Sequence, residues 1–256
     1  MIREFFGRLG MRALIVVALA SAFAPAARAE TLLVVGATGG TGREVVRQAV
    51  ANGHTVRAFV RDEAKARAVL GESVQYFVGD VRSGAGIEAA IKGADYVVSA
   101  LGSNVRNDPQ NTPERVDYNG VRLLAEAAAQ ARIKHFVLVS SMGVTHPDHP
   151  LNKMFGNILV WKLKGEDALR ASGVPYTVIR PGGLRDTTGG EAGIKAFQGD
   201  DLRNQGSIPR ADVATVALAA LGNPAAQGKT FELVSDSTVK RSDLAAIFAG
   251  LKTDAR

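Results

Sequence analysis

The chain has 256 residues, with 31 Lys or Arg against 25 Asp or Glu and a formal net charge of +6 at pH 7. It contains no cysteine and four histidines, which excludes disulfides and thiolate chemistry and disfavours a zinc site, so we expect no bound metal. Basic runs interleaved with aromatic residues are absent from the sequence, and we expect no nucleic-acid partner.

The first 29 residues predict an N-terminal leader. Three arginines precede an apolar run over 13–24, and the segment ends in Ala27-Arg-Ala29. This order is typical of a secretory signal peptide, and the apolar run is short for a membrane span. We therefore expect cleavage before Glu30, periplasmic or other export, and no stable membrane insertion afterwards. A retained membrane anchor and a cytoplasmic protein with a misassigned start are the alternatives.

The segment after the leader predicts a dinucleotide site. Thr31–Val35 is β-branched and apolar, as in a parallel strand buried on both faces. The strand breaks into Gly36-Ala-Thr-Gly-Gly-Thr-Gly42, and apolar residues then recur at helical spacing over 43–50. Glycines between strand and helix permit a sharp turn and close approach of a pyrophosphate, which the helix N-terminus favours. A purely structural glycine turn is the alternative.

The end of the second strand, 54–61, indicates which dinucleotide binds. An acidic residue there would accept hydrogen bonds from a ribose 2′-hydroxyl, whereas Arg61 would pair with a 2′-phosphate. We predict NADP, with NAD as the alternative because Asp62 follows immediately. NADP is made in the cytosol, so the predicted cofactor and the predicted export are in conflict.

Strands and helices alternate through the rest of the chain. We expect strands over 74–78, 94–100, 134–141 and 175–180, and helices over 86–92, 113–132 and 155–172. No linker or repeat divides 30–256, which predicts one α/β domain with a doubly wound parallel sheet, the Rossmann fold. The tail from Gly183 departs from this alternation and is expected to form a small substrate-side region.

Several further motifs accompany the glycine turn. They are Val-Gly-Asp at 78–80, Val-Ser-Ser-Met-Gly at 139–143, Pro-Asp-His-Pro-Leu-Asn-Lys at 147–153, Lys-Gly-Glu-Asp-Ala-Leu-Arg-Ala-Ser-Gly at 164–173, Tyr-Thr-Val-Ile-Arg-Pro-Gly-Gly at 176–183 and Pro-Arg-Ala-Asp-Val-Ala at 209–214. With these residues the chain after Glu30 resembles the atypical short-chain dehydrogenase/reductase superfamily, especially its NmrA-like NAD(P)-binding branch.

The resemblance implies a set of site residues. The glycines would line the pyrophosphate, Arg61 would meet the adenosine phosphate, and Lys164 would reach the nicotinamide ribose. Lys164 and Ser140 would also be catalytic, Ser140 by hydrogen bonding to a substrate carbonyl. The implied cofactor residues are Gly36, Thr38, Gly39, Gly40, Thr41, Gly42, Arg61, Asp80, Val81, Ser140 and Lys164. Because ligands bind beyond the carboxyl ends of parallel strands, we also expect Ala100, Leu101, Gly102 and Pro181 near the cofactor. An exposed helix lysine and a serine that satisfies the next loop are the alternatives for the two catalytic residues.

The sequence departs from the superfamily at the proton donor. Dehydrogenases of the superfamily carry a tyrosine four residues before this lysine, where Val160 stands here. Valine has no proton to exchange, and the indole of Trp161 is poorly acidic. The candidate substitutes are Tyr118, His135, His146 and His149.

Two functions are compatible with this pattern. The first is an NAD(P)H-dependent oxidoreductase that acts on an unidentified small molecule. The second is a non-catalytic NADP(H)-binding redox sensor or assembly factor, favoured by Val160 in the tyrosine position. We expect a monomer or a weak homo-oligomer, because alanines on the helix over 113–132 suit packing within one chain or between two.

Overall fold

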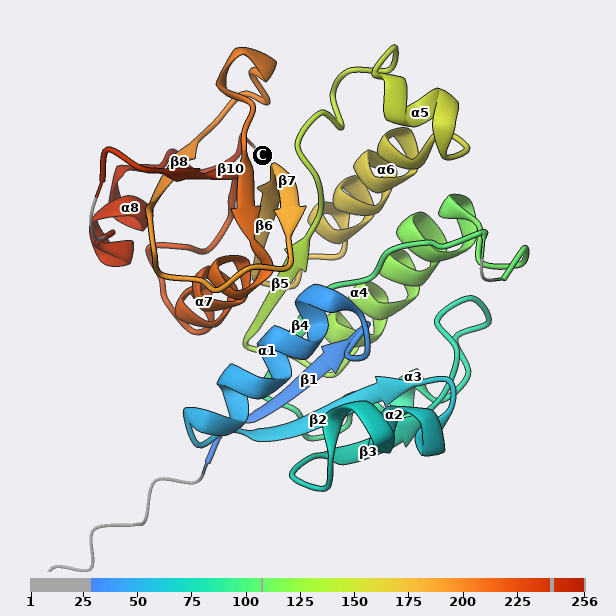
Figure 1. The fold of residues 1–256 in the computed structure, drawn as a ribbon. Helices are drawn as coiled ribbons and strands as arrows, with labels where there is room; N and C mark the ends of the chain where they lie inside the picture. The colour runs from blue at the N-terminus through green and yellow to red at the C-terminus, as the bar shows by residue number, and fades with distance from the viewer. Residues whose placement is uncertain (1–28, 107, 240–241, 256) are drawn as a thin grey trace, which may run out of the picture.

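The computed structural model describes residues 29–106, 108–239 and 242–255, so the predicted leader lies outside the described residues except for Ala29. A central sheet carries helices on both of its faces (Figure 1). Among the described residues, no helix has the length and apolar character that a membrane crossing requires. The predicted α/β fold with a doubly wound sheet is confirmed.

The main sheet has eight strands in the order β3-β2-β1-β4-β5-β6-β10-β8. All neighbours are parallel except β8, which pairs antiparallel with β10 at the edge. The strands are β1 (Thr31–Val35), β2 (Thr55–Val60), β3 (Gln75–Val78), β4 (Tyr96–Ser99), β5 (His135–Val139), β6 (Tyr176–Pro181), β8 (Gly193–Phe197) and β10 (Lys229–Asp236). The chain order reverses between β1 and β4, which is where open α/β sheets bind ligands.

Two apolar cores lie on the two faces of the sheet. One packs α1, α7 and α8 against the strands, and the other packs α3, α4 and α6. The helices are α1 (Gly40–Ala51), α2 (Glu63–Leu70), α3 (Ile87–Ile91), α4 (Val121–Gln130), α5 (Pro150–Met154), α6 (Ile158–Ala171), α7 (Arg210–Ala220) and α8 (Leu244–Gly250), with a short 3₁₀ turn at Leu202–Asn204. The two cores fix the strands from both faces, and the carboxyl ends of the parallel strands lie together at one edge of the sheet.

Three elements differ from the sequence prediction. The helix predicted over 113–132 begins as a π-helix, η1 (Glu114–Gly120), and continues as α4. The polar loop after β5 contains the short helix α5. The tail after Gly183 is less separate than predicted, because it supplies β10 and β8 to the main sheet as well as a two-stranded sheet, β7 (Gly183–Arg185) with β9 (Ser207–Pro209).

Candidate cofactor and substrate site

The glycine turn between β1 and α1 has a backbone that only glycine can adopt. Gly36 has φ +78°, and a side-chain carbon there would lie 2.6 Å from the Ala100 carbonyl oxygen. A carbon on Gly42 would lie 2.1 Å from the Gly36 oxygen. The Gly39 amide donates to that same oxygen at 3.0 Å and closes the turn. The glycines therefore bring α1 against the ends of β1 and β4.

The first turn of α1 offers uncapped amides. Helix α1 has Gly39 at its N-cap, no side-chain cap and no acidic residue in its first turn. By contrast, Asp62 caps α2 by accepting from the Lys65 amide at 3.0 Å. The first amides of a helix have no carbonyl partner within it, and together with the helix dipole they favour an anion. The turn therefore fits a pyrophosphate, with Thr38 and Thr41 beside it.

A cluster of charges lies beyond the ends of β2 and β3. Arg61 is 54% exposed and contacts Asp108 at 2.9 Å, and Arg82 contacts the same carboxylate at 2.8 Å. Arg82 also binds Asp80 at 2.6 Å, and this hydrogen bond lowers the pKa of Asp80. The carboxylate of Asp80 is thus engaged by Arg82, while Val81 beside it is buried. Arg61 is the more exposed of the two cations.

Lys162, which the sequence analysis did not select, lies beside the segment that follows β4. Its Nζ is 2.8 Å from Oδ1 of the buried Asp117 and donates to the Leu101 carbonyl oxygen at 3.3 Å. The other oxygen of Asp117 accepts from the Ser103 amide at 3.2 Å. Asp117 is on η1, so the π-helix places this carboxylate next to the ammonium of Lys162. Leu101, one of the residues predicted to lie near the cofactor, thus contacts the ammonium of Lys162.

Lys164 is exposed and lies elsewhere. Its ammonium is 4.2 Å from the centre of the Trp161 ring, which in turn stacks on Tyr118. This placement does not support the role predicted for Lys164, and it puts Tyr118 in an aromatic contact with Trp161. Ile158 lies one helical turn before Lys162 and Val160 one turn before Lys164, so neither position supplies a phenol.

Ser140 is also oriented away from its predicted role. Its hydroxyl donates to the buried carboxylate of Glu166 at 2.6 Å. Arg180 holds the same carboxylate at 2.6 Å and reaches Glu232 at 3.1 Å. Burial raises the pKa of Glu232, although Arg180 opposes the shift. Ser140 is thus part of a buried charge network, and its neighbour Ser141 lines the adjoining cavity.

The substrate-side cavity has a volume of about 850 Å³ and lies where Lys162 meets the C-terminal segment. Its walls are mainly apolar, with the cations Arg106, Lys162 and Arg210 and the imidazole of His149 among them. The remaining lining residues are Ser103, Asn104, Val105, Pro113, Ser141, Met142, Leu151, Phe155, Ile158, Leu159, Pro181, Gly182, Gly183, Leu184, Leu202, Gln205 and Gly206. A largely apolar cavity with a few polar groups is typical of a small-molecule site.

Of the residues predicted to replace the missing tyrosine as proton donor, only His149 lies on the wall of this cavity. Its Nδ1 accepts from the Leu151 amide at 3.2 Å, so the neutral ring carries its proton on Nε2. His146 donates through Nε2 to the Asp200 carbonyl oxygen, 2.8 Å away. His135 is buried at the opposite end of β5, and burial lowers its pKa to about 4. Of these three histidines, only His149 therefore lines the substrate-side cavity.

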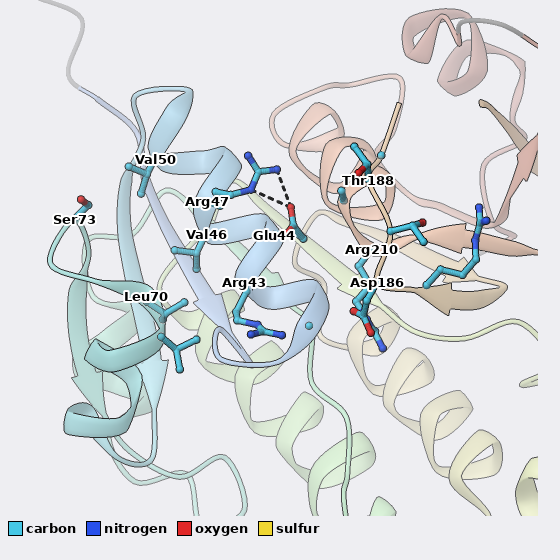
Figure 2. Close-up of a pocket in the computed structure, with 16 residues that line it drawn as sticks. Arg43, Glu44, Val46, Arg47, Val50, Leu70, Ser73, Asp186, Thr188 and Arg210 are labelled. Atoms are coloured by element: carbon cyan, nitrogen blue, oxygen red, sulfur yellow. Dashed lines mark hydrogen bonds and ion pairs between the residues drawn. The ribbon is translucent and has the colours of Figure 1, made fainter. Parts of the chain in front are cut away.

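A second depression, the outer groove, lies on the far side of α1 and has a volume of about 800 Å³ (Figure 2). Its lining residues are Gly40, Arg43, Glu44, Val46, Arg47, Val50, Val69, Leu70, Ser73, Arg185, Asp186, Thr187, Thr188, Gly189, Arg210 and Ala211. Gly40, which belongs to the glycine turn, and Arg210 both line this groove, so the groove adjoins the turn. Two of the arginines that line the groove are paired with carboxylates of the same groove, Arg47 with Glu44 at 2.8 Å and Arg210 with Asp186 at 2.8 Å.

The chain belongs to the NAD(P)H-binding family, whose model matches residues 36–224. This family lies within the atypical short-chain dehydrogenase/reductase superfamily that the sequence motifs indicated, which confirms the resemblance. The predicted dinucleotide class is confirmed as NAD(P)H.

Two curated relatives are informative about function. Sanguinarine reductase of Eschscholzia californica is 33% identical over 243 residues, which cover 80% of this chain and 89% of the relative. Photosystem II assembly factor Ycf39 of Trieres chinensis is 35% identical over 156 residues, which cover 60% of this chain and 46% of the relative. Several other relatives are named as chloroplastic proteins. The family thus includes a protein named as a reductase and one named as an assembly factor.

Two solved structures share the fold across most of the chain. A Bacillus halodurans protein described as an NAD-dependent epimerase/dehydratase is 27% identical with a TM-score of 0.73, covering 87% of this chain and all of that one. The anaerobilin reductase of Escherichia coli O157:H7 is 26% identical with a TM-score of 0.68, covering 80% and 97%. Reductases are therefore present among both the sequence and the structural relatives.

Proposed function

We propose that the protein is an NADPH-dependent reductase of an electrophilic small molecule. The observation that carries this proposal is Lys162, whose ammonium is held by the buried Asp117 and lines the substrate-side cavity beside the segment after β4. A buried carboxylate that fixes a lysine at the edge of a nucleotide site and a ligand cavity is unusual in a purely structural setting. The relatives named as reductases support the same conclusion.

Different residues of the cavity would bind the cofactor, bind the substrate and deliver the proton. Bound NAD(P)H supplies a hydride. Lys162 would bind the nicotinamide ribose, since its ammonium has three donors, of which one is given to Leu101, while Asp117 holds it by an ion pair. Ser141 and His149 would hydrogen bond to the polar group of the substrate, and Nε2 of His149 would deliver the proton that accompanies hydride transfer. Ile158, one helical turn before Lys162, has no proton to donate, which leaves this task to the histidine.

The choice of NADP rests on Arg61. Its guanidinium is more than half exposed and is held by one shared carboxylate, that of Asp108. A 2′-phosphate carries more charge than a carboxylate and matches the guanidinium in a bidentate geometry. We therefore propose NADP in preference to NAD.

A non-catalytic NADP(H)-binding sensor or assembly factor is the second candidate. The observation in its favour is the absence of a phenol at both Ile158 and Val160, one turn before Lys162 and Lys164. A relative named as an assembly factor supports it. In this case cofactor binding would change the surface offered to a partner without turnover.

The test is NADPH oxidation with a panel of quinones, aldehydes and flavins. The wild-type protein is expected to oxidise NADPH with at least one class, and Lys162→Gln to lose roughly 100-fold in rate. Lys164→Gln, two residues away on the same helix, is the matched control and should keep its rate. NADPH binding without oxidation by any acceptor, or oxidation by Ile158→Tyr alone, would instead support the sensor.

The compartment and the assembly state are part of the proposal. Because of the leader over 1–29 we propose export, followed by function as a monomer or weak homo-oligomer with a small-molecule ligand. Fractionation of cells that express the full chain tests the first point. A mature protein that begins at Glu30 is the expected product.

A further inference from the structure

Arg210 approaches the glycine turn from the C-terminal part of the chain. Helix α7 begins at Arg210, and the guanidinium Nη1 lies 3.3 Å from Thr41 Oγ1, across 169 residues of sequence. A side-chain carbon on Gly40 would lie only 2.6 Å from Arg210 Nε. Gly40 therefore leaves open the space that the arginine occupies, and the guanidinium reaches the uncapped end of α1.

This position is electrostatically unfavourable without an anion. The N-terminus of α1 carries partial positive charge, and a guanidinium next to it adds to that charge. The anion present is Asp186, whose Oδ1 accepts from Arg210 Nε at 2.8 Å. Its side chain is 77% exposed, and an ion pair this exposed contributes little stability. Figure 2 shows Arg210 and Asp186 together opposite α1.

We propose that Arg210 is a ligand of the cofactor pyrophosphate and that it exchanges the carboxylate of Asp186 for phosphate oxygens when NAD(P)H binds. A guanidinium binds phosphate in a planar, bidentate geometry that a screened carboxylate pair cannot match. Arg210 also lines the substrate-side cavity, so the same side chain would contact the cofactor at the edge of the substrate space. This inference rests on the proposed cofactor site.

The exchange has a consequence for the segment 186–190. Two contacts tether this segment to the first turn of α7: Asp186 to Arg210, and the Gly190 amide to Asp212 Oδ1 at 2.7 Å. Asp212 is buried, whereas Asp186 is exposed. Cofactor binding therefore releases the first tether and keeps the second. Residues 187–189, on the wall of the outer groove, become freer while Gly190 stays fixed.

The test compares three ligands on the full chain by calorimetric titration. ADP-ribose contains the pyrophosphate, 2′-AMP contains the phosphate predicted to meet Arg61, and NADPH contains both. Arg210→Gln is expected to weaken NADPH and ADP-ribose about tenfold or more and to leave 2′-AMP unchanged. Asp186→Asn should bind all three at least as tightly as the wild type. Arg47→Gln, another arginine of the outer groove, is the matched control and should change none.

Hydrogen exchange gives a second readout on the wild type. With ADP-ribose, amides 187–189 are expected to exchange faster while that of Gly190 stays protected. Wild-type affinity of Arg210→Gln for ADP-ribose would overturn the inference and leave the proposed function intact. Equal weakening for all three ligands, or unchanged exchange over 187–189, would likewise overturn it. Absence of NADPH binding by the wild type would overturn the proposed function as well.

Discussion

The glycine turn and the substrate side of the molecule are held together in different ways. The turn over 36–42 is fixed by backbone geometry, because carbons at Gly36 and Gly42 would collide with carbonyl groups. The substrate side is fixed by side chains from distant segments, such as Asp200, which accepts from the amides of Gly143 and Thr145 at 2.6 and 2.8 Å. The turn is thus a local property of the sequence, whereas the cavity wall is a property of the folded chain.

The largest effect is expected where the turn itself is changed. Gly42→Ala would place a carbon 2.1 Å from the Gly36 oxygen, a distance that the backbone must relieve by moving α1. We expect NADPH affinity to fall by more than about 100-fold, measured by calorimetric titration. Gly250→Ala is the control, since a carbon there meets nothing within 4 Å. Tight NADPH binding by Gly42→Ala would show that the backbone does not fix the site.

Substitutions on the substrate side should lower the free energy of unfolding rather than the cofactor affinity. Asp200 is fully buried, and its removal strands the amide of Gly143 and both donors of Thr145. We expect Asp200→Ala to lower the free energy of unfolding by about 2–4 kcal/mol in urea titrations, and Asp200→Asn to lower it less. The control is Asp148→Ala at an exposed aspartate of the same region. A large loss of 2′-AMP affinity in Asp200→Ala would indicate that the two regions are coupled.

Stability should also fall in acid because of His135, at the end of β5 opposite the site. Burial lowers its folded pKa to about 4, below the unfolded value of about 6.5, so the unfolded chain binds a proton first. The contribution of neutral His135 to the free energy of unfolding is complete above pH 6.5. It is lost as the pH falls to 4, and the loss amounts to up to about 3 kcal/mol. His135→Gln should flatten the dependence of unfolding free energy on pH between these values. Equal slopes for wild type and His135→Gln would contradict the assignment.

The smallest expected effect concerns cofactor choice. Arg61→Gln should reduce NADPH affinity about tenfold and leave NADH affinity unchanged, because only the 2′-phosphate loses its partner. Titration with both nucleotides measures the ratio. A matched loss for NADH would assign Arg61 to the adenosine common to both cofactors.

The sequence predicts those parts of the fold that depend only on residues close together in the chain. The order of strand, glycine turn and helix requires no knowledge of distant residues, and the structure has β1, the turn and α1 at the predicted places. The contact of Asp200 with Gly143 joins segments 57 residues apart and has no local signature. The cavity wall could not be predicted from the sequence for this reason.

The residues proposed for the site, Lys162 and Ser141, differ in phase from the residues predicted from the sequence, Lys164 and Ser140. Lys162 and Lys164 are two residues apart on α6, which places them about 200° apart around the helix. Gly165, Glu166 and Leu169 mark the buried side of that helix, and Lys162 precedes the first two by three and four residues. The apolar periodicity of α6 could therefore have selected Lys162. Ser140 and Ser141 are adjacent residues at the end of β5, and adjacent positions of an extended chain face opposite sides.

The most direct test of the account is calorimetric titration of the full chain with NADPH and NADH. We predict one site, with NADPH binding at least about tenfold more tightly because Arg61 has a 2′-phosphate to bind. Absence of binding by either nucleotide would contradict the account, since the uncapped end of α1 and the glycine turn would then hold no cofactor.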